Sequence, residues 1–582
     1  MHKNLYHTIF NFVIRLGKLA LYYCEECNIP LLKSKCSCGK EAMHVKLTPP
    51  GDVRPAFEYD KKIVGETIRE QFGSCYMPRV MLMNSIPAID KSDEIIIDGK
   101  VAGLFYYDIF SKKFYFQPRP WYASLLEVKK GYVIADKGAE KAILKNSNLM
   151  APGVKEVDGE VKRGDEVVVL NEDGEVIATG KAFMDAEEMN RRGMAVKIRW
   201  RGKEEAEKKE GKSWKDVIKE NEDVIRSIQG RAVTFIKNII EKYRLPSVVS
   251  FSGGKDSLAT LLLTLDAGYE MPLLFIDTGL EFEETIKHVH EIVDAYGLQL
   301  IEGKAGRKFW DSLPFFGPPA RDFRWCCKTC KLGVASQLIK ENFAGGILSL
   351  IGQRRYESFN RAKHGKVWKN PWVHGQIGAS PIQNWTALHI WLYLFMKKAR
   401  WNKLYEQGFA RIGCWLCPAC DMAEFELKKH RDWQIFNESL ITFSKKHALP
   451  KEWIDLGLWR WRRKPKWSPV DYVIEEKREY NIEGNEKRIE NFLGILGEVK
   501  KRGKKYVVNE VKIEIGKEIK ASSNEKVIKD IIYRAINCVG CGVCISKCNS
   551  NAIYIKNGKA WINEHCIHCM QCMDECPVIV FK

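Results

Sequence analysis

Residues 248–257 read Val-Val-Ser-Phe-Ser-Gly-Gly-Lys-Asp-Ser, and they decide the fold of the largest part of the chain. The apolar start of this stretch predicts a buried strand, and the apolar run 258–265 that follows predicts a helix. Between the two, paired glycines let backbone N–H groups approach an anion at the positive end of the helix. Lys255 adds a positive charge, and Asp256 is suited to hold a magnesium ion. The stretch therefore predicts a phosphate-binding loop.

Strands and helices alternate after this loop, which is typical of a parallel α/β sheet. Ser252–Ser257 resembles the loop of the PP-loop ATP pyrophosphatases, and the segments 272–285, 352–361 and 381–409 are similar to motifs of the phosphoadenosine phosphosulfate (PAPS) reductase family. The resemblance covers roughly residues 245–425. It implies a doubly wound parallel sheet of the adenine-nucleotide α-hydrolase (HUP-like) type, with the nucleotide at the carboxyl ends of the strands. The nucleotide-binding residues that it implies are Ser252, Gly253, Gly254, Lys255, Asp256, Ser257, Asp277, Thr278, Gly279, Arg354 and Arg361.

Six cysteines lie within this segment, as Cys-Cys-x2-Cys and, farther along, Cys-x2-Cys-Pro-x-Cys. A Cys-Cys pair followed by a distant Cys-x2-Cys resembles the 4Fe–4S site of adenylyl-sulfate (APS) reductases, with Lys331 as a cationic neighbour. The implied ligands are Cys326, Cys327, Cys414 and Cys417. Cys330 and Cys420 depart from that pattern. They leave open a rival set, Cys327 and Cys330 with Cys414 and Cys417, which would hold zinc or a cluster.

Two runs with the spacing Cys-x2-Cys-x2-Cys-x3-Cys end the chain. Such a run wraps three irons of a cubane, and in bacterial-type ferredoxins its fourth thiolate reaches the other cluster. Asn549 stands where a proline usually follows the fourth cysteine, whereas Pro577 keeps it. The alternative is zinc binding or a structural remnant. The two expected 4Fe–4S ligand sets are Cys538, Cys541, Cys544 and Cys576 (cluster one), and Cys566, Cys569, Cys572 and Cys548 (cluster two).

A fourth cysteine group lies near the start of the chain, in a short segment rich in turns. Four thiolates at this spacing suit tetrahedral zinc, which would supply folding energy that so few apolar residues cannot. A small cluster or a redox pair is the alternative. The expected zinc ligands are Cys24, Cys27, Cys36 and Cys38.

Residues 125–201 contain short apolar runs separated by glycine turns, and 166–170 with 175–178 predict a β-hairpin. The segments 136–142, 151–154 and 164–167, among others, resemble the PUA domain, a small β-barrel of archaeal RNA-modifying enzymes. The resemblance implies an RNA partner. The alternative is a barrel that serves stability or protein interaction only. Three lysines of this segment could meet phosphates: Lys137, Lys141 and Lys145.

The net charge of +19 favours a polyanionic partner, although a chain that simply uses Lys and Glu heavily, as thermophile proteins do, would also show it. The alternating Trp and Arg residues of 459–467 add a candidate surface for nucleic acid, with a partly buried helix end as the alternative.

Every cysteine except Cys75 falls into a cluster, which indicates metals and a reducing compartment. No apolar run has the length of a membrane span, so we expect a cytoplasmic protein.

These patterns together predict a multidomain α/β chain. The expected division is an N-terminal amphipathic helix and zinc ribbon at 1–57, a small mixed α/β segment at 58–124, a PUA-like domain at 125–201, a charged helical linker at 202–245, a PP-loop domain at 246–430, a helical extension at 431–504, and a two-cluster ferredoxin-like α+β domain at 505–582.

Two departures from the family's pattern affect the expected function. Assimilatory reductases carry a nucleophilic cysteine in a Glu-Cys-Gly-type tail, whereas the nearest match here, 575–577, belongs to the ferredoxin run. Their phosphate loop is usually degenerate, whereas this one is intact. We therefore expect ATP-dependent RNA (tRNA) sulfuration, with a low-potential electron donor; the alternatives are an APS or PAPS reductase and a non-catalytic RNA-binding scaffold. The candidate catalytic residues are Lys255, Asp256, Cys330 and Cys420.

Overall fold

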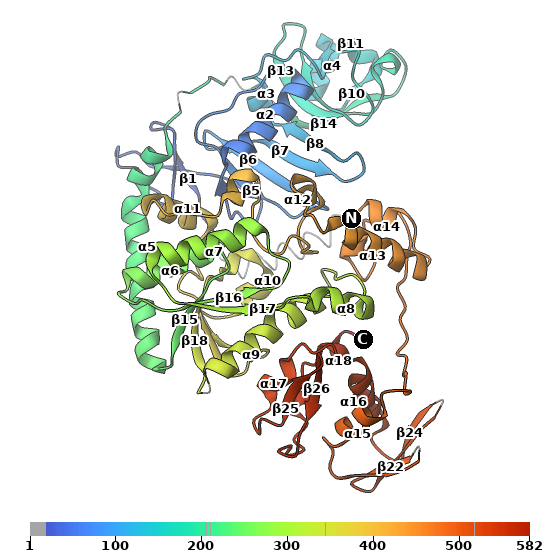
Figure 1. Ribbon diagram of the computed structural model, residues 1–582. Helices are drawn as coiled ribbons and strands as arrows, with labels where there is room; N and C mark the ends of the chain where they lie inside the picture. Colours follow the sequence, from blue (N-terminus) through green and yellow to red (C-terminus); the bar gives the residue numbers. More distant parts are fainter. Residues whose placement is uncertain (1–18, 204–205, 210, 344, 504, 517) are drawn as a thin grey trace.

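The computed structural model describes residues 19–203, 206–209, 211–343, 345–503, 505–516 and 518–582 (Figure 1). The amphipathic helix expected at the N-terminus falls on residues 1–18 for most of its length and so lies outside the described residues. Among the described helices, none combines the length and the apolar character that crossing a membrane requires.

The central sheet has six strands in the order β17-β16-β15-β18-β20-β19. All neighbours are parallel except the edge strand β19, which pairs antiparallel with β20. The predicted doubly wound parallel sheet is thus confirmed. Its strands are β15 (Ser247–Ser250), β16 (Leu273–Asp277), β17 (Leu300–Lys304), β18 (Ile347–Ile351), β19 (Val367–Lys369) and β20 (Gln376–Ala379).

Helices cover both faces of this sheet (Figure 1). One face packs against apolar residues of α5, α6, α7 and α11, and the other against α9. The helices of this part are α5 (Trp214–Tyr243), α6 (Lys255–Asp266), α7 (Glu283–Tyr296), α8 (Lys308–Phe316), α9 (Gly333–Asn342), α10 (Phe359–Lys363), α11 (Ala387–Met396) and α12 (Met422–Leu427).

Helix α5 occupies the segment in which the sequence predicts a helical linker. It is a core element as well, because Ile225 and Ile236 on its apolar stripe are fully buried against the layer of α6 and α11. Its Asn221 is also fully buried, donating to the carbonyl oxygen of Pro30 and accepting from the N–H of Leu32. The helix therefore fixes the N-terminal ribbon onto the central domain.

Three smaller units precede α5. The ribbon is a sheet of β1 (Tyr22–Cys24), β2 (Ile29–Leu31) and β3 (Met43–His44). A five-stranded antiparallel sheet follows, containing β4 (Arg54–Pro55), β5 (Leu82–Ser85), β6 (Ser92–Ile97), β7 (Lys100–Asp108) and β8 (Lys113–Pro118), with α2 (Glu58–Phe72) and α3 (Pro120–Ala123). The third unit is a six-stranded sheet in the order β10-β14-β13-β12-β9-β11, which contains the predicted hairpin. Its elements are β9 (Tyr132–Ala135), α4 (Lys137–Leu144), β10 (Leu149–Met150), β11 (Val154–Val157), β12 (Glu166–Leu170), β13 (Val176–Ala182) and β14 (Met194–Arg201).

The C-terminal unit begins earlier than the residue 505 expected from the sequence, because α15 packs against both α16 and β26. It lies at the opposite end of the molecule from the β9–β14 sheet (Figure 1). Helices α13 (Trp433–Lys446) and α14 (Glu452–Asp455) connect it to the central domain. Its elements are α15 (Glu486–Leu493), β21 (Val499–Arg502), β22 (Lys505–Val508), β23 (Val511–Ile515), β24 (Ile519–Ala521), α16 (Glu525–Asn537), α17 (Val543–Lys547), β25 (Ile553–Lys556), β26 (Lys559–Ile562) and α18 (Pro577–Val580).

Candidate nucleotide and iron–sulfur sites

The predicted phosphate loop joins the carboxyl end of β15 to the first turn of α6. Gly253 has φ +72°, a backbone conformation that a residue with a side chain rarely adopts, and Gly254 is the N-cap of α6. At the end of β18, a Cβ on Gly352 would lie 2.5 Å from the backbone of Asp256. Glycine at these positions therefore lets two strand ends approach the start of the helix, where its dipole favours an anion.

A buried charge network fills this corner. Asp256 accepts from the Lys255 ammonium at 2.7 Å and from the Arg354 guanidinium at 2.6 Å. Burial alone would raise the pKa of Asp256, but the adjacent Arg354 and Lys255 lower it to about 2. Asp256 is therefore ionised at neutral pH, as a magnesium ligand has to be.

The network includes a residue that the sequence did not single out. Asp52 lies 302 residues before Arg354 and accepts two bonds from its guanidinium, at 2.8 and 3.1 Å. It also accepts from the N–H of Ala387 at 2.6 Å, at the first residue of α11. The only sequence signal was its place within residues 47–57, a stretch rich in proline and glycine. Tyr405 lies in the segment 381–409 that resembles a family motif, but it was not expected to be a ligand; its hydroxyl accepts from the N–H of Lys255 at 2.9 Å.

The remaining predicted nucleotide ligands lie on two neighbouring segments. Asp277 ends β16 and accepts from the N–H of Gly279 at 2.8 Å. Thr278 is almost fully buried beside them. Arg361, on α10, is partly exposed and forms an ion pair with Glu357. The strand ends thus bring Asp277, Thr278 and Gly279 next to the loop, whereas the guanidinium of Arg361 is engaged by Glu357 in the 3-10 turn before α10.

The central cysteines lie beside this corner. The sulfur of Cys414 is 3.3 Å from the Thr278 hydroxyl and 3.7 Å from the Glu281 carboxylate. Cys327 begins a π-helical turn, η3 (Cys327–Leu332), that leads into α9. Hydrogen bonding to Cys326 lowers the pKa of the Cys327 thiol to about 6. The Arg324 guanidinium is close to the same group, 4.0 Å from the Cys417 sulfur.

The two extra cysteines have different surroundings. Cys330 is 1% exposed within an apolar cluster, and burial raises the pKa of its thiol to about 11. Cys420 hydrogen-bonds Cys417, which lowers the pKa of the Cys417 thiol to about 5. Its carbonyl oxygen accepts from two arginines, Arg321 and Arg460. Cys420 therefore belongs to the central group, whereas Cys330 is packed in the core. The pKa of the Cys420 thiol is raised as well, by its hydrogen bond to Cys417 and by burial.

The C-terminal cysteines surround two positions. A cavity is lined by Cys548, Cys566, Cys569 and Cys572, the four residues predicted for cluster two. Backbone N–H groups of Ala552 and Ala560 donate to the sulfurs of Cys548 and Cys538, at 3.2 and 3.3 Å. Cys541, Cys544 and Cys576, three of the four predicted for cluster one, are buried. These residues fit 4Fe–4S clusters, because a polar donor at a buried cysteine sulfur stabilises a thiolate.

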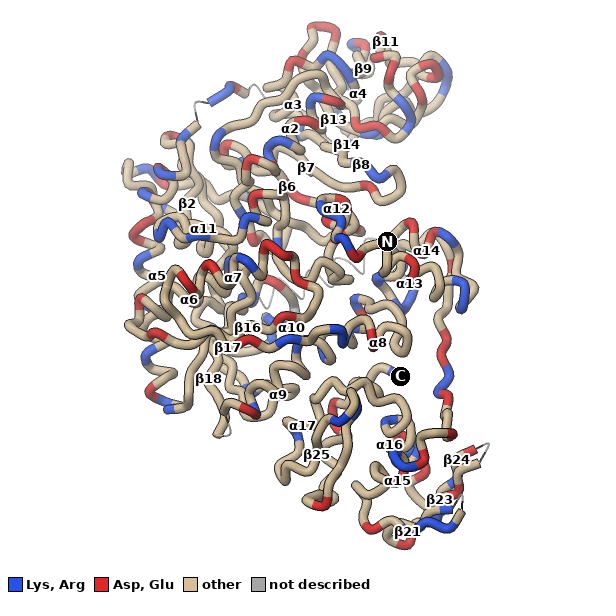
Figure 2. The backbone as a smooth tube through the Cα atoms, viewed as in Figure 1, with Lys and Arg blue, Asp and Glu red and all other residues tan. Residues whose placement is uncertain are grey.

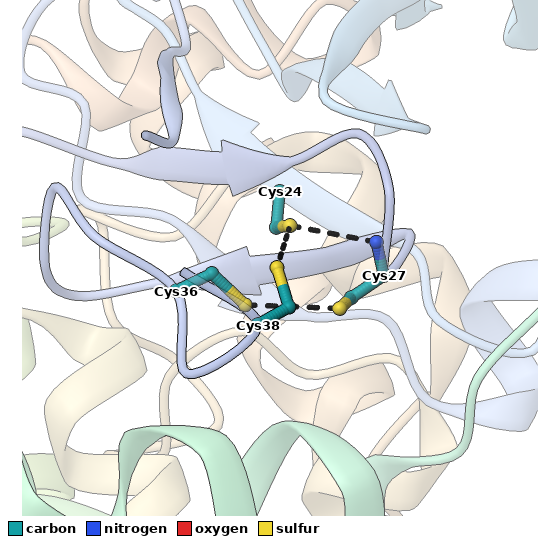
Figure 3. A group of neighbouring side chains, drawn as sticks. All are labelled: Cys24, Cys27, Cys36 and Cys38. Atoms are coloured by element: carbon teal, nitrogen blue, oxygen red, sulfur yellow. Dashed lines mark hydrogen bonds between the residues drawn. The ribbon is translucent and has the colours of Figure 1, made fainter. Parts of the chain in front are cut away.

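The ribbon cysteines form a much tighter group (Figure 3). The four sulfurs of Cys24, Cys27, Cys36 and Cys38 all lie within 4.8 Å of one another. The Cys24–Cys38 and Cys27–Cys36 pairs are each 3.7 Å apart. One ion can contact all four at this spacing, whereas a cubane holds its thiolates farther apart because each binds a different iron. The donor set fits a structural zinc site.

The C-terminal unit docks on α9, the helix that follows the central cysteine turn. A Cβ on Gly333, the first residue of α9, would lie 2.3 Å from the carbonyl oxygen of Cys541. Further along α9, the Lys340 ammonium donates to the carbonyl oxygens of Ile545 and Cys548 at 2.6 and 2.9 Å. Cys576 belongs to the same apolar cluster as Trp325 and Cys330. The structure therefore places the predicted cluster-one loop against the central domain.

The candidate nucleic-acid residues differ in exposure. The lysines at 137, 141 and 145 are exposed on and just after α4, as expected. In contrast, Trp459 is 2% exposed, and Arg460 is fully buried in an ion pair with Asp90. The segment 459–467 is thus a partly buried connection and not an aromatic binding surface. Figure 2 shows basic and acidic positions interspersed in all parts of the chain.

Comparison with known proteins supports three of the units. The model of the phosphoadenosine phosphosulfate reductase domain matches residues 246–420, that of the PUA domain residues 131–200, and that of the 4Fe–4S dicluster domain residues 537–580. An uncharacterized protein of Methanocaldococcus jannaschii is 39% identical over 477 residues, which are 77% of this chain and 98% of the relative. A second one from that organism is 30% identical over 68% of this chain and 93% of its own length.

More distant similarities follow the same division. An adenosine 5'-phosphosulfate reductase of Bacillus anthracis is 24% identical over 32% of this chain and 81% of its own length. A solved phosphoadenylyl-sulfate reductase of Candida auris covers 33% of this chain and 94% of its own, with 20% identity and a TM-score of 0.27. A PUA domain protein of Thermoplasma acidophilum covers 26% of this chain and 95% of its own, with 24% identity and a TM-score of 0.22.

Proposed function

Because this chain belongs to the PAPS reductase family and carries a PUA domain and a 4Fe–4S dicluster domain, we propose that it is an ATP-dependent RNA-sulfurating enzyme, with tRNA as the substrate. One observation carries the proposal: an intact phosphate loop, with Lys255 and an ionised Asp256 at the start of α6, lies beside a cysteine group at the next strand end. An intact loop suits cleavage of ATP between its α and β phosphates. Simple reduction of an adenylyl sulfate needs no such cleavage.

The chemistry balances in two steps. A carbonyl oxygen of an RNA base attacks the α-phosphorus of ATP, and pyrophosphate leaves. A sulfide then attacks the activated carbon, the carbon–oxygen bond breaks, and AMP leaves with the oxygen, so that C=O becomes C=S. Sulfur delivered as a persulfide needs two further electrons to cleave its S–S bond; bound 4Fe–4S clusters supply electrons one at a time.

Each residue of the corner has a role in this scheme. Lys255 would neutralise the phosphates, and Asp256 would hold a magnesium ion that adds positive charge beside them. Arg354 orients Asp256, and Asp52 holds Arg354 in place. Of the two candidate sulfur carriers, Cys420 is favoured over Cys330, because Cys420 is partly exposed and hydrogen-bonds Cys417 of the central group, whereas Cys330 has almost no exposed surface.

The remaining cofactors and partners follow from the other units. Cys326, Cys327, Cys414 and Cys417 would hold a central 4Fe–4S cluster, and the ribbon cysteines would hold a structural zinc. The exposure of Cys569 supports cluster two as the entry point for electrons from a low-potential donor. The PUA domain would bind the RNA, with the exposed lysines of α4 meeting phosphates.

A reductase of APS or PAPS is the second candidate, and the similarity to adenosine 5'-phosphosulfate reductases favours it. It would need neither RNA nor a loop competent for ATP cleavage. Mass spectrometry of tRNA nucleosides from a strain lacking this protein separates the two. The proposal expects a thiolated nucleoside to disappear, and to stay absent when only the Lys255→Ala form is restored. An unchanged nucleoside profile, with loss of sulfite production, would instead identify the reductase.

A further inference from the structure

Two buried arginines lie among the cysteines of the C-terminal unit and have no part in the scheme above. Arg534 of α16 is 1% exposed, and its Nη1 donates to the sulfurs of Cys572 and Met573 at 3.2 and 3.0 Å. Arg488 of α15 is 7% exposed and donates to the carbonyl oxygens of Ala535 and Ala560, at 2.9 and 3.0 Å. Neither arginine has a carboxylate partner among the contacts of the described residues.

Both guanidinium groups keep one donor unused. The Nη2 atoms of Arg488 and Arg534 are buried, and neither finds a hydrogen-bond partner within the described part of the chain. The ring of Phe492 lies between the two, 5.4 Å from one guanidinium carbon and 5.0 Å from the other. Burying a charge with a free donor is costly unless something neutralises it. A thiolate-ligated cluster, with its net negative charge, is a group of that kind.

The two predicted clusters do not share these charges equally. Arg488 lies beside Cys538, a predicted ligand of cluster one. Arg534 lies beside Cys544 and Cys576 of cluster one and bonds Cys572 of cluster two. Cluster one therefore faces both arginines, whereas cluster two faces one. A nearby buried cation stabilises the reduced, more negative state of a cluster and so raises its reduction potential.

Burial acts in the opposite direction. Three ligands of cluster one are buried (Cys541, Cys544 and Cys576), whereas two of cluster two are buried (Cys548 and Cys572) and Cys569 is exposed. A medium of low dielectric disfavours added negative charge, which by itself would lower the potential of cluster one. The same medium strengthens the attraction of a contacting cation. The two clusters differ by one buried ligand and by one buried arginine, and we take the arginine as the larger effect.

We propose that Arg488 and Arg534 raise the reduction potential of cluster one above that of cluster two, so that an electron shared by the pair resides on the cluster that abuts the central domain. The inference rests on the two ligand sets proposed above. It does not depend on the RNA, on ATP or on the acceptor of the reaction.

Reductive titration of the anaerobically purified full chain, followed by electron paramagnetic resonance, tests it. The Cys569→Ser variant identifies the signal of cluster two. In the wild type we expect that signal to appear second, at the lower potential. Arg488→Gln should lower only the midpoint potential of cluster one, and Arg534→Gln should lower the midpoint potentials of both clusters. Arg488→Lys should keep both potentials at their wild-type values. Iron and sulfide content confirm that each variant is loaded.

Arg478→Gln is the matched control, because Arg478 pairs with Asp530 and the carbonyl oxygen of Lys582, and no cysteine is among its partners. It should leave both midpoints unchanged. The proposal is overturned if the cluster-two signal appears first, or if Arg488→Gln shifts neither midpoint or shifts both equally. The order in which the two signals appear in the wild type tests the proposal even if an arginine variant does not incorporate its clusters. Neither outcome of this titration changes what the nucleoside experiment shows. The proposal on the arginines and the proposal of RNA sulfuration can therefore be refuted independently.

Discussion

Replacing Gly333 with alanine should loosen the C-terminal unit from the central domain. The new Cβ would lie 2.3 Å from the carbonyl oxygen of Cys541 and 3.2 Å from that of Lys328. Both neighbours are backbone atoms, which cannot turn away as a side chain can. To remove the overlap, α9 and the segment around Cys541 must therefore separate by about 1 Å. Overpacking of this kind costs about 1–3 kcal/mol, and the helix preference of alanine returns about 0.5–1 kcal/mol. The net loss of up to about 2 kcal/mol makes undocking up to about 30-fold more frequent.

Hydrogen exchange of the anaerobically loaded protein measures this change. Amides of α9 and α17 should exchange up to about 30-fold faster in Gly333→Ala than in the wild type. Gly230→Ala is the matched control, because Gly230 is also helical and exposed, and its Cβ would meet nothing within 4 Å. That variant should stabilise α5 by about 0.5–1 kcal/mol. Equal exchange of α9 and α17 in the wild type and in both variants would refute the described docking.

Four further changes have defined outcomes. Lys255→Ala should weaken ATP binding about 10- to 150-fold by removing a charged hydrogen bond to phosphate, as measured by calorimetry; unchanged affinity would exclude the loop as the site. Asp52→Asn should lower the free energy of unfolding by about 1–3 kcal/mol, because it weakens a buried partner of Arg354, and denaturant titration would show it. Burial lowers the pKa of His389 to about 4 in the folded chain. Below pH 6.5 the unfolded chain therefore binds more protons at this residue than the folded chain does. His389 should thus lower the free energy of unfolding by about 3 kcal/mol as the pH falls from 6.5 to 4. His389→Gln should flatten the pH profile of unfolding by that amount, and an unaltered profile would contradict the burial. Cys27→Ser should remove one zinc per chain in elemental analysis and leave iron unchanged, whereas loss of iron would reassign the ribbon.

The parts of this fold that could be predicted from the sequence are those encoded locally. The strand, loop and helix around 248–265 are contiguous, and their residue types determine their conformation. Cysteine spacing likewise predicted the ribbon ligands, because a metal group within one short turn-rich segment leaves few arrangements. The hairpin of β12 and β13 is local in the same way, because two apolar runs flank a short turn that contains glycine.

The parts that could not be predicted depend on residues far apart in the chain. Asp52 reaches Arg354 across 302 residues, and no periodicity signals that pairing. Arg460 looked solvent-exposed among tryptophans, but Asp90, 370 residues earlier, neutralises it in the core. The docking of Cys541 on Gly333 is of the same kind, because it is set by tertiary packing.

Product analysis of the anaerobic, metal-loaded protein incubated with ATP, sulfide and tRNA tests the central proposal most directly. The proposal predicts that pyrophosphate and AMP are released in equal amounts, only when tRNA is present, and that Lys255→Ala releases neither. Release of sulfite from adenylyl sulfate without any requirement for tRNA, together with no cleavage of ATP, would contradict it.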